Sequence, residues 1–268
     1  MRNKTIVSLS FDDGREDTYR VAYKIMKKYG LIGTIHATTG YIDNTWKPEK
    51  WESAKGNMTV EELKEMKENG FEISSHGDKH ITKKADLLNS ISKFYEWGID
   101  LKKIGFSIPT SKIVEESKVD FIEFLKKNNI AYMRGGRNPQ CYTLKLKIIY
   151  LLYKISKFQL FYNLFNSRNC IDIYQKNKID NYNLFSVVVR NEDSATTITK
   201  LIESNIDKPK WIILMLHGIQ DKNEVTYGKD PWCWDKLNFE TLCKSLKHME
   251  DSGDISVKTI LDVIEEIK

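Results

Sequence analysis

The chain has 268 residues, of which 41% are hydrophobic and 29% charged, as in a globular protein with a real core. Its formal charge of +5 is small and spread along the chain, so it does not indicate nucleic-acid binding. No run approaches the roughly 18 apolar residues of a membrane span, and the start, MRNKTIVSLSFDDG, does not resemble a signal peptide. We therefore expect a cytoplasmic protein whose four cysteines are free thiols.

Apolar runs typical of strands alternate with amphipathic runs typical of helices. In chain order we predict strands at 5–11, 33–38, 71–75, 104–108, 130–133, 184–189 and 211–216. We predict helices at 16–29, 59–69, 87–97, 119–128, 195–205, 237–249 and 257–267. Thr59 and Glu62 predict a capping box for the second helix.

This alternation predicts an α/β fold, namely a distorted parallel (β/α) barrel of about seven strands. We expect one catalytic barrel over residues 1–268. The stretch 138–182 breaks the alternation and is rich in Tyr, Phe, Leu and Lys, so it is interpreted as an insertion.

Side chains with catalytic chemistry follow the predicted strands. Asp12 and Asp13 follow the first strand, His76 and His80 the third, and His217 the last. The carboxyl ends of barrel strands share one face, where active sites are built. The i, i+4 histidine pair suits a divalent metal. One aspartate would complete the ligand set and the other would serve as a general base, but the spacing leaves open which is which.

Each motif alone also has a structural explanation. Asp-Asp-Gly is more often a turn, a histidine pair at this spacing is often not a metal site, and a lone histidine is often part of a core. The combination is more specific, because three of the five histidines in the chain occur at these strand ends.

Three motifs, SFDDG, SSHGDKH and LMLH, resemble in this order the first, second and last signatures of the polysaccharide deacetylase family, the NodB-homology domain. The resemblance implies a distorted (β/α) barrel and one divalent metal ion, commonly Zn²⁺, with Co²⁺, Ni²⁺ or Mn²⁺ as alternatives. By correspondence with the motifs, Asp12 is the general base. Asp13, His76 and His80 are the metal ligands, and His217 is the general acid.

The family's third motif, R-x-P-Y-G, is altered in this chain. Pro109 keeps the proline, whereas Ser107 stands at the arginine place and Thr110 at the tyrosine place. The arginine steadies the catalytic aspartate in the family, so Arg134 or Arg137 is a candidate replacement. A backbone N–H near Thr110 is expected to hold the oxyanion.

The family's fourth motif is not evident, and Asp193 is a candidate for orienting His217. Further tentative substrate contacts are Pro109, Thr110, Arg134, Trp232 and Trp234. The two tryptophans suit packing against sugar rings, and one of them equally suits a role in capping the barrel.

The stretch 144–165 carries lysines among bulky apolar residues. It fits a membrane-surface element near lipid-linked glycans, but a packed helical insertion or a dimer interface is favoured. We therefore keep an oligomer and a location at the inner face of the membrane as alternatives.

The function expected from these features is metal-dependent hydrolysis of N-acetyl or O-acetyl groups on a carbohydrate in glycan biosynthesis. The substrate would be an acetylated sugar, an oligosaccharide, or a lipid- or nucleotide-linked sugar. One alternative is an amidase acting on a non-sugar N-acyl compound. Another is a degenerate glycan-binding barrel, which the altered third motif favours and the intact aspartate and histidine set disfavours.

Overall fold

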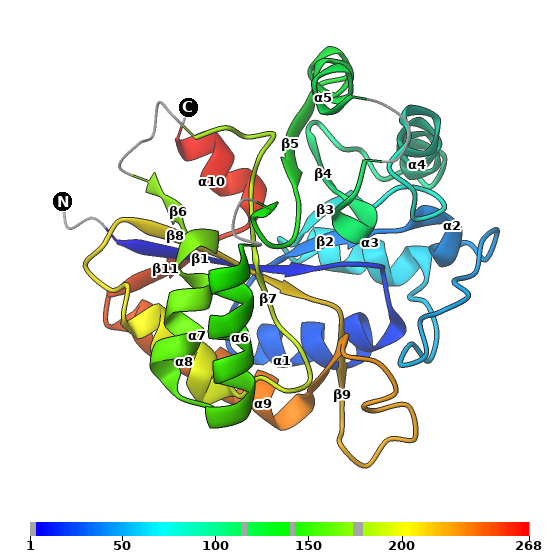
Figure 1. Ribbon diagram of the computed structural model, residues 1–268. Helices are drawn as coiled ribbons and strands as arrows, with labels where there is room; N and C mark the ends of the chain where they lie inside the picture. Colours follow the sequence, from blue (N-terminus) through cyan, green and yellow to red (C-terminus); the bar gives the residue numbers. More distant parts are fainter. Residues whose placement is uncertain (1–3, 114–116, 140–142, 174–178, 268) are drawn as a thin grey trace.

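The computed structural model describes residues 4–113, 117–139, 143–173 and 179–267. A strongly twisted parallel sheet crosses the centre of the molecule, with helices on its outer side (Figure 1). Its strands lie in the order β5–β4–β3–β2–β1–β8, with β7 paired to β8. Their bounds are β1 Thr5–Phe11, β2 Thr34–Ala37, β3 Glu72–Ser75, β4 Ile104–Ser107, β5 Ile130–Arg134, β7 Val187–Val188 and β8 Lys210–Leu216.

Backbone hydrogen bonds join the two ends of this row of strands. Arg134 of β5 forms a parallel bridge with Leu184, and the Ser186 N–H donates to the Gly136 carbonyl at 2.8 Å. The same segment continues into β7, which pairs with β8. The sheet therefore curls into the predicted distorted (β/α) barrel.

Several short strands were not predicted. β6 (Ile171–Asp172) pairs antiparallel with the start of β8, and β11 (Ile255–Val257) pairs parallel with the start of β1. β9 (Gly218–Gln220) and β10 (Cys233–Asp235) form a separate pair. These runs of two or three residues are too short to show a period along the sequence.

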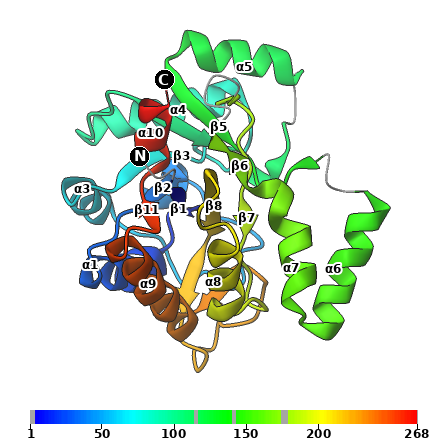
Figure 2. The ribbon, with the colours of Figure 1, turned by 90° about the vertical axis from the view of Figure 1, so that its left-hand side faces the viewer.

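The helices that were predicted lie close to their ranges, a short helix at Thr39–Ile42 was not predicted, and the helices surround the strands (Figure 2). The predicted capping box of α3 is confirmed, with the Glu62 N–H donating to Thr59 Oγ1 at 3.2 Å and the Thr59 N–H donating to Glu62 Oε2 at 2.8 Å. The first helix begins as a π-helix over Thr18–Tyr23. The α-helices are α1 Lys24–Lys28, α2 Thr39–Ile42, α3 Val60–Glu68, α4 Lys84–Glu96, α5 Lys118–Lys127, α6 Leu144–Ser156, α7 Gln159–Asn166, α8 Ala195–Glu203, α9 Lys236–Asp251 and α10 Ile260–Glu266.

The stretch that we interpret as an insertion contributes a helical hairpin, α6 and α7, which stands beside the barrel next to α8 (Figure 2). The Arg137 guanidinium lies 5.0 Å from the Tyr150 ring and 4.6 Å from the Phe165 ring, and the two rings stack on each other. The Tyr153 hydroxyl donates to Asp193 Oδ1 at 3.1 Å. The inner side of the hairpin is thus packed against the barrel.

Alternate residues along β1 face two different environments, an apolar one and a polar one. Val7, Leu9 and Phe11 of β1 belong to the main apolar cluster, which also contains buried residues of the surrounding helices. Ser8 and Ser10, between them, are buried among polar partners, and the Trp211 Nε1–H donates to Ser8 Oγ at 3.0 Å. The barrel therefore has a polar centre, which connects to the site at its carboxyl end.

The described cysteines, Cys170, Cys233 and Cys243, are free thiols, as predicted, and Cys141 lies outside the described residues. In the described part of the chain, no helix is long and apolar enough to cross a membrane.

Candidate active site

The strand-end residues singled out in the sequence converge in one cleft of about 370 Å³. It lies at the carboxyl end of the barrel strands, where active sites of barrels are built. Asp12 and Asp13 come from the end of β1, His76 and His80 from the loop after β3, and His217 from the end of β8. The wall also includes Thr110 and Trp232.

Asp13, His76 and His80 place their ligand atoms within 4.8 Å of one another. Each histidine Nε2 lies 3.7 Å from Asp13 Oδ1. The His76 Nδ1 faces the Ser107 carbonyl at 3.0 Å, so an N–H there would donate and leave the Nε2 lone pair directed at Asp13. This arrangement suits one divalent ion on one carboxylate and two imidazoles.

The protonation states also fit a cation. Burial lowers the pKa of His76 and His80 to about 3, which keeps both rings neutral, the form that binds metal. Burial raises the pKa of Asp13 well above its ordinary value. A cation between the three groups would offset the cost of burying that carboxylate's charge.

The backbone at two of these residues is unusual. Asp13 has φ 79° and His80 φ 55°, in the left-handed region that non-glycine residues rarely adopt. The His80 loop is folded around Asp86, whose carboxylate accepts the N–H groups of Asp78 and Lys79, both at 2.9 Å. Strain of this kind persists where surrounding contacts hold it, commonly at functional sites.

Asp12 is held by Arg134, which is 1% exposed. Arg134 Nη1 donates to Asp12 Oδ2 at 3.1 Å and Nη2 donates to Oδ1, in a two-point contact. The Ser107 hydroxyl also donates to Asp12 Oδ1, at 3.4 Å. The guanidinium that contacts Asp12 therefore comes from β5 rather than from the altered third motif on β4. The other candidate, Arg137, lies in the hairpin contact with Tyr150.

A chain of hydrogen bonds continues from Arg134 through the polar centre of the barrel. Arg134 Nη2 lies 3.3 Å from His36 Nδ1, and His36 Nε2 lies 2.9 Å from the Tyr132 hydroxyl. Tyr132 donates to Glu72 Oε1 at 2.5 Å. The directions agree if His36 carries its proton on Nε2. Burial lowers the pKa of His36 well below 6.5, which keeps the ring in this neutral form.

His217 packs against Trp232, with ring centroids 4.7 Å apart. The Arg190 guanidinium lies over the same tryptophan ring at 5.0 Å. Burial lowers the pKa of His217 to about 3. Its Nδ1 is buried without a hydrogen-bond partner among the described residues.

Four expectations about individual residues were wrong. Asp193 does not contact His217, because its carboxylate accepts the Tyr153 hydroxyl and the Arg190 N–H instead. Trp234 is buried away from the cleft, where it packs on Phe239 and donates to the Asp193 carbonyl at 2.8 Å. The third, direct substrate contact by Arg134, is excluded by its burial behind Asp12. Pro109 is also buried and, unlike Thr110, does not line the cleft.

Other cleft residues were missed, because most lie on loops and the two at strand ends, Ile108 and Met215, are apolar. The missed residues are Arg15, Lys50, Trp51, Ile108, Ser111, Met215 and Asp230. The Trp51 ring lies 5.0 Å from His80, and the Trp46 ring, 5.6 Å from Trp51, stacks on His80 at 6.1 Å. The two tryptophans in the long connection between residues 43 and 57 were the feature of the sequence that could have indicated this part of the cleft.

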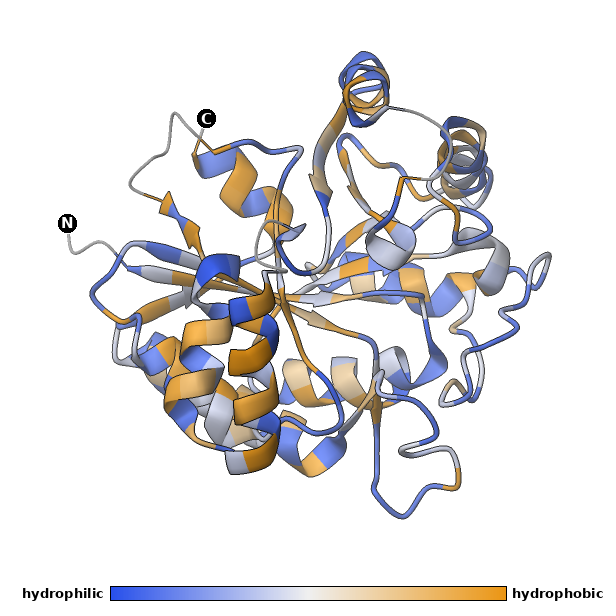
Figure 3. Ribbon diagram, viewed as in Figure 1, coloured by the Kyte–Doolittle hydropathy of each residue, from blue (hydrophilic) through white to orange (hydrophobic). Residues whose placement is uncertain are grey.

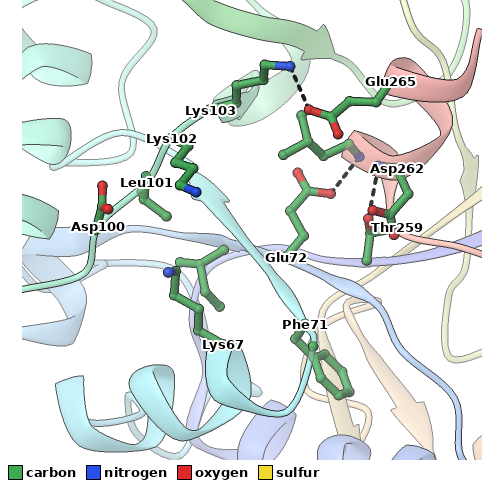
Figure 4. Close-up of a pocket in the computed structure, with 13 residues that line it drawn as sticks. Lys67, Phe71, Glu72, Asp100, Leu101, Lys102, Lys103, Thr259, Asp262 and Glu265 are labelled. Carbon is green, nitrogen blue, oxygen red and sulfur yellow. Dashed lines mark hydrogen bonds and ion pairs between the residues drawn. The ribbon is translucent and has the colours of Figure 1, made fainter.

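A second cavity, of about 500 Å³, lies at the opposite end of the barrel (Figure 4). Glu72 on its wall accepts the Leu261 N–H at 2.8 Å, and Lys103 pairs with Glu265 at 2.7 Å. The amino ends of barrel strands usually serve stability, and these paired groups fit that role.

The family comparison agrees with the motifs at the amino-terminal end. The family model described as polysaccharide deacetylase matches residues 1–99. The resemblance to the polysaccharide deacetylase family is confirmed. A Bacillus subtilis (strain 168) protein named "Putative polysaccharide deacetylase YxkH" is 36% identical over 75 residues, which span 28% of this chain and 23% of that protein.

Solved structures of family 4 carbohydrate esterases share the fold over nearly the whole chain. An acetyl xylan esterase from Clostridium thermocellum, in complex with a cobalt ion, is 12% identical with a TM-score of 0.51, over 97% of this chain and 91% of that one. A family 4 pseudoenzyme from Bacillus anthracis is 10% identical with a TM-score of 0.50, over 98% and 66%. These likenesses show the fold that this chain shares with the esterase structures.

Proposed function

We propose that the chain is a metal-dependent hydrolase that removes acetyl groups from a carbohydrate. The observation that carries the proposal is the meeting of Asp13, His76 and His80 beside Asp12 and His217 in one cleft. These residues supply a ligand set, a base and a histidine next to one another, as amide or ester hydrolysis requires.

Asp13, His76 and His80 would hold the metal. When bound, the ion supplies Lewis acidity toward the acetyl carbonyl and lowers the pKa of water. The Clostridium thermocellum esterase structure, which shares this fold, is a complex with a cobalt ion, and this supports a divalent ion here. Its identity in this chain is proposed as Zn²⁺, on the ligand chemistry of two imidazoles and a carboxylate.

Asp12 would be the general base. It accepts a proton from the attacking water while Arg134 holds both of its oxygens in place. The water oxygen bonds to the acetyl carbon, the carbon–nitrogen bond then breaks, and the products are acetate and an amine. Water is a poor nucleophile at neutral pH, so this proton transfer is a large part of the rate enhancement.

His217 would protonate the leaving nitrogen. The ring is neutral in the free protein because burial lowers its pKa to about 3. The negative charge of the tetrahedral oxyanion beside it favours the imidazolium, so the ring takes up a proton from solvent during turnover and passes it to the amine, while the proton on Asp12 returns to solvent. An amine leaves poorly unless it is protonated.

The substrate is proposed to be an N-acetylated or O-acetylated sugar used in glycan biosynthesis. Trp51 and Trp232 line the cleft and offer aromatic faces to a sugar ring. Lys50 on the same wall adds a positive charge, which suits a lipid- or nucleotide-linked sugar carrying phosphate.

A second candidate function is glycan binding without hydrolysis. The resemblance in fold to a family pseudoenzyme and the altered third motif favour it. The presence of Arg134 on Asp12 argues against it, because the base keeps a guanidinium partner.

Acetate release would be measured on a panel of N-acetylated chito-oligosaccharides, nucleotide sugars and lipid-linked sugars, with the metal content measured in parallel. We expect about one metal ion per chain and acetate from at least one substrate class. Sugar binding without acetate release in the metal-loaded protein would favour the glycan-binding alternative.

A further inference from the structure

Helix α6 is apolar on two opposite sides. Its inner side, which includes Leu146 and Tyr153, is buried. Its outer side carries a stripe of exposed apolar residues at positions i, i+4, i+7, i+8 and i+11, namely Leu144, Ile148, Leu151, Leu152 and Ile155, which are 41–76% exposed. Such spacing places all five on one helical face, and this face has no partner in the part of the chain that the structure describes.

The apolar surface continues beyond α6. Phe158 in the connection is 67% exposed, and Leu160 and Leu164 of α7 are 64% and 45% exposed. We call these eight residues of α6, the connection and α7 the hairpin patch. They make up eight of the fourteen large apolar side chains that are exposed in the described residues, so apolar exposure is concentrated here. Figure 3 shows many hydrophobic residues along α6 and α7.

The charge around the hairpin patch is of one sign. Lysines 145, 147, 154 and 157 and Arg168 lie in this segment, and residues 143–171 contain no Asp or Glu. At about 100° per residue, Lys145 and Lys147 fall about 80° to either side of the α6 stripe. Within the described residues neither makes an ion pair, whereas Lys154 pairs with Glu192 at 3.3 Å.

The hairpin is held firmly enough to present this surface. The Tyr150 hydroxyl donates to Glu192 Oε1 at 2.6 Å, and the Tyr153 hydroxyl donates to Asp193 Oδ1. Both acceptors belong to the connection between β7 and α8. The stripe is therefore the outer face of a docked helix, and in Figure 2 α6 lies on the far side of α7 from the barrel.

We infer that the hairpin patch binds an anionic membrane surface, with its apolar side chains in the interface and its lysines at lipid headgroups. Apolar faces flanked by lysines bind in this way, because lysine stems lie along the apolar layer while their ammonium groups reach the headgroups. A second copy of the chain fits less well. A two-fold interface would set lysines against lysines, with no carboxylate of the segment to neutralise them.

The test is co-sedimentation of the full chain with phosphatidylcholine vesicles that contain phosphatidylglycerol, against pure phosphatidylcholine. We expect binding to the anionic vesicles at low salt and weaker binding at high salt, because salt screens the lysines. Ile155→Glu should reduce binding at least about tenfold, since it places a charge in the apolar stripe. Leu237→Glu is the matched control, because Leu237 is 71% exposed and Ile155 74%.

A charge variant completes the test. Lys145→Gln with Lys147→Gln should weaken binding to anionic vesicles at least about tenfold, whereas Lys236→Gln with Lys244→Gln, on exposed positions of α9, should not. Acetate release from a soluble substrate should be unchanged in all variants, which separates this inference from the proposed function. Absence of wild-type binding at low salt would overturn it, as would a dimer that Ile155→Glu dissociates without any effect on vesicles.

Discussion

At the scale of single residues, Asp12, the proposed general base, is held in a fixed orientation. Arg134 donates to both of its oxygens. Asp12→Asn keeps the shape of the side chain, but an amide cannot accept a proton from water. We expect acetate release to fall about 10²-fold or more, the usual effect of losing a general base. The measurement is kcat together with metal content. A wild-type rate with metal bound would remove Asp12 from the mechanism.

His217 is the second residue whose role can be tested alone. His217→Ala should bind metal normally and hydrolyse amides poorly, because the amine then has no proton donor. Activated esters should be affected much less, since their leaving groups depart without protonation. The ratio of amide to ester rates in wild type and variant measures this role. An equal loss on both substrates would indicate that His217 binds metal or orients substrate instead.

At the scale of elements, β5 carries two residues of the buried chain of hydrogen bonds. Tyr132→Phe removes the hydroxyl that lies between His36 and Glu72. A buried partner left unsatisfied costs about 1–3 kcal/mol of stability. Because these hydrogen bonds also lead to Arg134, we expect kcat to fall severalfold while KM and metal content stay unchanged.

Tyr182→Phe is the control for this variant. Its hydroxyl donates to the Ile130 carbonyl at 2.8 Å at the other end of β5. It should lower stability without lowering kcat. Equal kcat in the wild type and the Tyr132→Phe variant would restrict Tyr132 to a structural role.

Two of the strands that position the site could be predicted because their apolar runs are long. β1 and β8 span seven residues each, and the polar residues after them stand out against such runs. β6, with two residues, and β11, with three, give no such contrast. The connection that carries Trp46 and Trp51 has no hydrophobic periodicity, so its position beside the cleft could not be predicted from the sequence.

The partners of the strand-end residues were harder to predict than the residues themselves. Arg134 and Arg137 are three residues apart, and only the curvature of the barrel determines which guanidinium contacts Asp12. Asp193 was a candidate for orienting His217, but its carboxylate accepts a hydrogen bond from Tyr153 of α6 instead. Such contacts join distant segments and leave no local pattern.

At the scale of the whole molecule, the buried histidines make stability depend on pH. Burial lowers the pKa of His36 well below 6.5, whereas an unfolded chain has a histidine pKa of about 6.5. Below that pH the unfolded state binds a proton that the folded state does not, so stability is lost as pH falls. His36→Gln removes this contribution.

The free energy of unfolding in urea should therefore fall more steeply below pH 6.5 for the wild type than for His36→Gln. The difference between them should change by up to about 1.4 kcal/mol per pH unit. Comparing the two proteins cancels the contributions of the buried carboxyl groups of Asp13 and Glu72, whose raised pKa values act in the opposite direction. Stability profiles of equal slope in the two proteins below pH 6.5 would show that His36 takes up its proton in the folded state as it does in the unfolded state.

The central claim is that the cleft hydrolyses acetylated sugar by means of a metal held by Asp13, His76 and His80. The most direct measurement is acetate release by chelator-treated protein, titrated with Zn²⁺ or Co²⁺, on a substrate found active in the panel. We predict no acetate without metal, recovery of the rate at about one equivalent, and no recovery in His76→Ala at the same free metal. A full rate in the metal-free protein, or full metal occupancy and activity in His76→Ala, would contradict the account.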